Sequence, residues 1–134
     1  MKTYQLLLVE DNEGDVLLTS EALEEADFPF EIKIARTGKE AIDLLQDLSR
    51  EDLPDLVILD INLPVKNGFE VLREIRGNPI TVDLPVMILS TSSNMEDKRK
   101  ANKYDPKIFC SKPTEFSEFE VLVQTIKSIL QEGK

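Results

Sequence analysis

The chain has 134 residues, of which 41% are hydrophobic and 31% charged, and its formal net charge is −10. This length and balance predict one globular domain, residues 1–134, with enough apolar residues for a hydrophobic core. The negative charge argues against general nucleic-acid binding, because a phosphate backbone attracts clusters of Lys and Arg. The longest apolar runs are only a few residues long, so we expect no membrane span, no signal peptide and a cytoplasmic protein.

The chain contains no histidine and a single cysteine, Cys110. The absence of histidine excludes Ser-His-Asp triads, Cys-His pairs and His-ligated metal sites. A single cysteine cannot form an internal disulfide, and the position of Cys110 in a predicted strand favours a buried, unreactive thiol. Any chemistry in this protein must therefore depend on carboxylates, hydroxyls and lysines.

Segments typical of strands alternate with segments typical of helices along the chain, which predicts an α/β layer fold. In chain order we expect a strand at 4–9, a helix at 14–26, a strand at 30–35, a helix at 37–49, a strand at 55–60, a helix at 68–76, a strand at 85–90, a helix at 94–103, a strand at 107–111 and a helix at 117–131. Three helix starts match the capping-box pattern, namely Thr37 with Glu40, Ser93 with Glu96 and Ser117 with Glu120.

Three of the predicted strands contain uninterrupted apolar runs, which is typical of parallel strands covered by helices on both faces. The runs are 6–9, 56–59 and 86–89. The strand at 30–35 alternates apolar and charged residues and the strand at 107–111 is short, so both fit the edges of the sheet. With right-handed crossovers, the simplest strand order is 2-1-3-4-5. This order predicts a flavodoxin-like, doubly wound (βα)5 fold with a five-stranded parallel sheet.

The helix at 94–103 is the weakest of the predicted helices. It offers little beyond Met95 and Ala101 to bury against the sheet.

Acidic residues follow the first predicted strand and end the third. Glu10 and Asp11 follow the first strand, and Asp60 is the last residue of the third. These strands lie on opposite sides of the topological switch point, beyond which this class of fold binds its ligands. Converging carboxylates repel one another and need a cation, and hard oxygen ligands without His or Cys favour Mg²⁺.

Hydroxyl and lysine residues lie at the ends of the fourth and fifth predicted strands. Ser90 ends the fourth strand and Thr91 follows it, and Lys112 follows the fifth. A hydroxyl and an ammonium can contact phosphoryl oxygens, and a carboxylate such as Asp60 can attack phosphorus to form an aspartyl phosphate. Singly, these residues are more often helix caps or ordinary loop residues. Their joint placement at four adjacent strand ends favours a functional site.

Motifs at these four strand ends resemble those of the receiver domain of two-component response regulators, over essentially the full chain. The matching segments are 8–12, 55–64 leading to Gly68, 84–90, and Lys112-Pro113. The resemblance implies that Asp60 accepts a phosphoryl group from a phosphohistidine. The Mg²⁺ ligands that it implies are Glu10, Asp11, Asp60 and the backbone carbonyl of Asn62.

The resemblance also assigns roles around the phosphoryl group. It implies that Ser90 and Lys112 contact that group and that Phe109, with Ser90, forms the family's conformational switch. Phe109 lacks the hydroxyl of the commoner tyrosine, so an apolar pocket should define its inward state. The resemblance further predicts a cis bond between Lys112 and Pro113. Residues 103–107 replace the Gly-Ala turn that is common in the family, which leaves the shape of this loop open.

The resemblance also implies partners. Because the chain lacks histidine, the phosphoryl group must come from a sensor histidine kinase or a small phosphodonor. The run 10–16, with Phe116 and Phe119, resembles single-domain regulators that partner bacterial phytochrome kinases. We expect no output domain, and signalling through protein contacts on the face formed by the segments 94–103, 107–111 and 117–131. The same face is a candidate homodimer interface.

Two alternatives to a stand-alone response regulator remain. An aspartate-nucleophile phosphatase uses similar chemistry, but it typically needs a second Asp as general acid where this chain has Asn62. A receiver used as a phosphorylation-independent binding module should have lost part of the pocket, and none is missing. We therefore expect a protein that catalyses only its own phosphorylation and dephosphorylation, rather than an enzyme.

Overall fold

The computed structural model describes residues 2–63, 67–91 and 95–132. Within these ranges, five parallel strands form one sheet in the order β2-β1-β3-β4-β5. The strands are β1 (Tyr4–Val9), β2 (Phe30–Ala35), β3 (Leu56–Asp60), β4 (Val86–Ser90) and β5 (Ile108–Ser111). The predicted fold class and strand order are confirmed.

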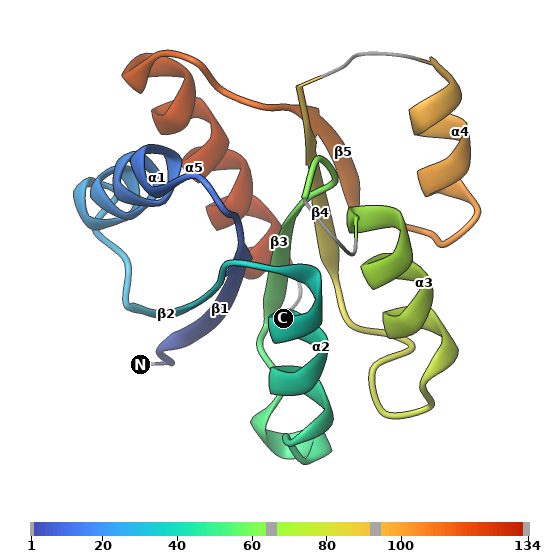
Figure 1. The fold of residues 1–134 in the computed structure, drawn as a ribbon. Coiled ribbons are helices and arrows are strands. Elements are labelled where there is room, and N and C mark those ends of the chain that lie inside the picture. The colour runs from blue at the N-terminus through green and yellow to red at the C-terminus, as the bar shows by residue number, and fades with distance from the viewer. Residues whose placement is uncertain (1, 64–66, 92–94, 133–134) are drawn as a thin grey trace.

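Helices cover both faces of the sheet, with α1 and α5 on one side and α2, α3 and α4 on the other (Figure 1). They are α1 (Glu13–Glu25), α2 (Gly38–Gln46), α3 (Gly68–Gly77), α4 (Met95–Asn102) and α5 (Phe116–Glu132). A short 3-10 helix, η1 (Arg50–Asp52), follows α2 and was not predicted. No helix among the described residues is long and apolar enough to span a membrane.

The core is divided by the sheet into two hydrophobic clusters, because side chains alternate between the two faces of each strand. All residues of β3 and β4 are buried, as expected for central strands, whereas β2 alternates between partly buried and exposed residues along most of its length. Helix α4 buries only Ala101, and Met95 is exposed. This pattern agrees with the prediction that the helix at 94–103 has little to bury against the sheet.

One of the predicted capping boxes forms in part at the start of α2. Thr37 Oγ1 accepts a hydrogen bond from the backbone N–H of Glu40 at 3.0 Å. The Glu40 carboxylate accepts from the N–H of Arg36, one residue before the expected partner. The Ser93 capping box lies outside the described residues.

The predicted capping box at Ser117 is wrong. Helix α5 begins one residue earlier, at Phe116. Glu118 Oε1 instead accepts hydrogen bonds from the backbone N–H groups of Thr114 and Glu115, at 3.2 and 3.1 Å. An acidic residue at the third position of the helix therefore satisfies the backbone donors that precede the helix.

Arg76, at the end of α3, forms hydrogen bonds with the loop at residues 103–107, where other family members often have a Gly-Ala turn. Its guanidinium donates hydrogen bonds to the backbone carbonyls of Tyr104 and Asp105 in this loop, at 2.7 and 3.0 Å. It also donates to the carbonyls of Val82 and Leu84 before β4, at 3.0 and 2.7 Å. The loop between α4 and β5 is thus tied to α3 and to the start of β4.

Candidate functional site

The parallel register of the sheet brings four strand ends to one edge. Val9 pairs with Leu59, so Glu10 follows β1 beside Asp60 at the end of β3. Asp60 pairs with Leu89, and Ser90 pairs with Ser111. The residues predicted to form the site are therefore neighbours at the carboxyl edge of β1, β3, β4 and β5.

Three carboxylates converge at this edge. Glu10 and Asp60 are 2% and 1% exposed, whereas Asp11 is exposed. Each of the three contributes an oxygen, and these oxygens lie within 4.8 Å of one another. Backbone N–H groups hold the two buried carboxylates in place, that of Asn12 on Glu10 at 3.1 Å and that of Asn62 on Asp60 at 2.8 Å. This set of oxygen donors fits a divalent cation such as Mg²⁺ or Mn²⁺.

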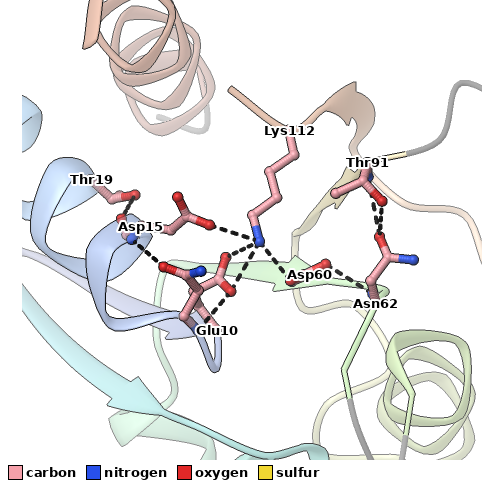
Figure 2. Close-up of polar contacts among 8 residues, drawn as sticks. Glu10, Asp15, Thr19, Asp60, Asn62, Thr91 and Lys112 are labelled. Carbon is pink, nitrogen blue, oxygen red and sulfur yellow. Dashed lines mark hydrogen bonds and ion pairs between the residues drawn. The ribbon is translucent and has the colours of Figure 1, made fainter. Parts of the chain in front are cut away.

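Lys112 reaches into the same pocket (Figure 2). Its Nζ lies 2.9 Å from Glu10 Oε1 and 3.0 Å from Asp60 Oδ2. A third carboxylate, that of Asp15 in the first turn of α1, lies 3.0 Å from the same atom. Asp15 was not predicted as a site residue. An acidic residue in the first turn of a helix ordinarily interacts with the helix N-terminus, so the sequence gives no separate signal for this contact.

Burial and neighbouring charges change the proton affinity of this pocket. Burial raises the pKa of Glu10 from 4.5 to about 7; hydrogen bonding to Lys112 opposes this increase, and the Asp60 charge adds to it. Burial lowers the pKa of Lys112, but its hydrogen bonds with Glu10, Asp15 and Asp60 outweigh burial and raise it. Lys112 therefore stays charged near neutral pH, and a further cation beside Glu10 would favour its ionised form.

Asn62 and Thr91 link the end of β3 to the end of β4. Asn62 Oδ1 accepts hydrogen bonds from the backbone N–H and the hydroxyl of Thr91, at 3.1 and 3.0 Å. Ser90 is 1% exposed, and its carbonyl accepts from the backbone N–H of Lys112 at 2.7 Å. These contacts hold the β3, β4 and β5 ends together around Asp60.

Strand β5 and the residues directly after it contain Phe109, Cys110 and the bond between Lys112 and Pro113. Phe109 is partly buried and packs against the cluster beneath α2, α3 and α4, which agrees with an apolar inward position. The described residues contain no cis peptide bond, so the predicted cis bond between Lys112 and Pro113 is wrong. The trans form is the intrinsically favoured isomer at such bonds, by about 0.5 to 1 kcal/mol.

Cys110 is only partly buried, and burial raises the pKa of its thiol, which agrees with an unreactive side chain.

Gly68 allows the start of α3 to lie against the end of β3. Its backbone N–H donates to the carbonyl of Ile61 at 3.2 Å. A Cβ at this position would lie 2.4 Å from Ile61 Cα and 2.8 Å from the carbonyl oxygen of Asp60. The backbone that carries Asp60 is thus positioned by a contact that only glycine permits.

The comparisons with known proteins agree with this geometry. The family model of the response regulator receiver domain matches residues 6–126, and the chain belongs to this family. Receiver domains bind a divalent metal, for which the three converging carboxylates are suited.

Individual members of this family are similar to the chain over most of its length. The chain is 35% identical over 126 residues to the response regulator Rcp1 of Synechocystis sp. (strain ATCC 27184 / PCC 6803 / Kazusa), covering 92% of this chain and 86% of that protein. The phosphorylated cyanobacterial phytochrome response regulator RcpA superposes with a TM-score of 0.89 at 33% identity, over 99% of this chain and 97% of RcpA. The Mn²⁺-bound form of Rcp1 gives a TM-score of 0.82 at 34% identity, over 93% and 92% of the two chains.

Proposed function

We propose that this protein is a response regulator that accepts a phosphoryl group on Asp60 from the phosphohistidine of a sensor histidine kinase. The Mg²⁺ ligands in this proposal are Glu10, Asp11, Asp60 and the backbone carbonyl of Asn62. The observation that carries the proposal is the buried Asp60 carboxylate, with two further carboxylates and the Lys112 ammonium around it.

The proposed transfer uses residues already in place. An oxygen of Asp60 attacks phosphorus, the N–P bond of the phosphohistidine breaks, and the imidazole leaves with the bonding electron pair. The Lys112 ammonium then pairs with a phosphoryl oxygen, and the Ser90 hydroxyl donates a hydrogen bond to another. When bound, Mg²⁺ would neutralise charge on the transferred group. Ser90 and Phe109 would carry the resulting change to the surface.

The kinase partner is proposed to be a bacterial phytochrome. This rests on the chain's similarity to RcpA and to other phytochrome-associated regulators. The chain contains no histidine, so it cannot form its own phosphohistidine donor. We place the protein in the cytoplasm, where ATP-dependent kinases act.

The output is proposed to be protein contact on the face formed by α4, β5 and α5, with residues 1–134 acting as a single receiver domain. A homodimer through this face is one form of that output. Light scattering with and without a phosphoryl mimic tests it, and an unchanged mass would exclude dimerisation as the response. The chain would then catalyse only its own phosphorylation and dephosphorylation.

A phosphatase is the less favoured function. It would need a general acid at position 62, but Asn62 carries an amide whose oxygen accepts from Thr91. Continued hydrolysis of many phosphate esters per protein molecule would favour the phosphatase.

The phosphorylation experiment uses a small phosphodonor, Mg²⁺ and intact-mass measurement. We expect the native protein to gain the mass of one phosphoryl group and Asp60→Asn to gain none. Asp47→Asn, an exposed residue at the end of α2, is the matched control and should be modified like the native protein. Chelation of Mg²⁺ should abolish the reaction. An unmodified native protein, or equal modification of Asp60→Asn, would refute the proposed function.

A further inference from the structure

The Lys112 ammonium contacts two of the three carboxylates that are candidate metal ligands. Its Nζ lies 2.9 and 3.1 Å from the two carboxylate oxygens of Glu10 and 3.0 Å from Asp60 Oδ2. Glu10 and Asp60 are two of the three candidate metal ligands. A divalent cation and this ammonium therefore compete for the same oxygens.

Asp15 is the third carboxylate on Lys112, and it is not in the cluster of candidate metal ligands. Its side chain is 24% exposed, compared with 3% for Glu10 and 2% for Asp60. Its backbone is held on both sides, since its N–H donates to Asn12 Oδ1 at 2.9 Å and its carbonyl accepts from Thr19 Oγ1 at 2.7 Å. The first turn of α1 thus presents this carboxylate to Lys112 from a fixed position (Figure 2).

We propose that Asp15 is a positioning residue, which keeps the Lys112 ammonium in the pocket when a divalent cation takes Glu10 and Asp60. Without metal, Lys112 shares its charge among three carboxylates. With metal bound, Asp15 becomes its remaining carboxylate partner, and Lys112 stays beside Asp60. This role rests on the proposed function, because Lys112 is held there for an incoming phosphoryl group.

The proposal has a thermodynamic consequence for metal binding. If the contact between Asp15 and Lys112 becomes stronger when metal binds, the gain in its free energy adds to the free energy of metal binding. For a partly exposed ion pair, we expect Asp15→Asn to weaken Mg²⁺ binding about three- to tenfold. Part of this loss of affinity would come simply from removing a negative charge near the cation. The experiment must therefore distinguish this charge effect from the loss of the contact with Lys112.

Calorimetric titration with MgCl₂ of the unphosphorylated protein measures the effect directly. Glu13→Gln is the matched control, because it removes one negative charge from the same turn of α1, and Glu13 pairs with the exposed Arg36 instead of Lys112. We expect Glu13→Gln to bind Mg²⁺ nearly as tightly as the native protein. Asp15→Glu, which keeps the charge, should recover part of the affinity. Unfolding curves of each variant show that the fold is retained.

A double-mutant cycle with Lys112→Gln separates positioning from simple charge. If Asp15 acts through Lys112, Asp15→Asn should weaken Mg²⁺ binding clearly less in the Lys112→Gln background than in the native one. Equal losses in both backgrounds, or no loss in the native background, would overturn the proposal.

A second readout distinguishes this proposal from the proposed function. At saturating Mg²⁺, Asp15→Asn should be phosphorylated more slowly by a small phosphodonor than the native protein, because Lys112 is no longer held beside Asp60. If the native protein binds Mg²⁺ but is never phosphorylated, the proposed function fails while the metal cycle still tests Asp15. If the native protein is phosphorylated and Asp15→Asn matches it in rate and affinity, only the role of Asp15 fails.

Discussion

At the scale of single residues, the geometry of the pocket depends on a few contacts around Asp60. The buried carboxylate of Asp60 is held by a backbone N–H on one oxygen and by Lys112 on the other. The backbone beneath it touches the start of α3 at Gly68, with no room for a side chain. Precise placement of Asp60, the proposed phosphoryl acceptor, therefore depends on packing as well as on charge.

Replacing Gly68 should damage both the fold and the pocket. The Cβ of Gly68→Ala would overlap backbone atoms of Asp60 and Ile61, which cannot turn aside like a flexible side chain. We expect a loss of about 2 to 4 kcal/mol in the free energy of unfolding, measured by urea denaturation, and weaker Mg²⁺ binding.

Gly77→Ala is the matched control for this prediction. Gly77 is the last residue of α3, has a negative φ, and a Cβ there would meet nothing within 4 Å. This substitution should be neutral or stabilise by up to about 1 kcal/mol. Equal stabilities of the two variants would show that the close approach at Gly68 is unimportant.

At the scale of elements, α4 is the least securely packed helix among the described residues. It buries Ala101 alone and makes few contacts with α3, apart from the Lys100 ammonium lying 5.7 Å from the centre of the Phe69 ring. The loop that follows it is held by hydrogen bonds from Arg76, together with the packing of Tyr104 against the core. The Arg76 guanidinium is therefore expected to contribute strongly to the stability of this region.

Replacing Arg76 should loosen this region specifically. Arg76→Gln cannot reach four carbonyls, and we expect a loss of about 2 to 3 kcal/mol in the free energy of unfolding. Amide hydrogen exchange should increase in residues 101–107 more than in α1. Arg73→Gln, an exposed arginine one turn earlier in α3, is the control and should change stability by less than about 0.5 kcal/mol. Unchanged exchange in this loop would contradict the assigned role of Arg76.

At the scale of the whole molecule, the absence of histidine isolates one group in the pH dependence of stability. The chain lacks histidine, the side chain whose usual pKa lies between pH 5.5 and 8, and burial raises the pKa of the Cys110 thiol above its usual value. Glu10 has a pKa of about 7 and therefore titrates between pH 5.5 and 8. Its folded pKa lies above the unfolded value, so the folded state binds the extra proton in this window.

The metal-free protein should therefore lose stability as the pH rises through about 7. The contribution of Glu10 is fully present below its unfolded pKa and is lost above its folded pKa, amounting to on the order of 2 kcal/mol between pH 5.5 and 8. Urea unfolding in the presence of a chelator measures this slope, and Glu10→Gln should flatten it. A native protein with no slope in this window would contradict the raised pKa.

Much of this molecule could be predicted because its signals are local. Uninterrupted apolar runs indicated β3 and β4 as central strands, and the alternation in β2 indicated an edge. Boundaries were less certain, since Ser117 matched a capping pattern although Glu118 satisfies the backbone donors before α5. Short capping motifs compete with one another, and packing of the helix decides which one forms.

The sequence by itself determined the strand order of the sheet and the acidic and hydroxyl residues at the strand ends. Because it contains no histidine, it also indicated that a phosphoryl donor must come from outside the chain. These follow from hydrophobic periodicity and from residue types at the ends of parallel strands. Only the tertiary structure decided that Asp15 lies on Lys112, that Arg76 holds the loop before β5, and that Gly68 abuts the backbone of Asp60. The first two contacts join residues distant in the sequence, and the third depends on how closely α3 approaches the end of β3. All three therefore depend on how the helices and loops pack against the sheet, which no local pattern encodes.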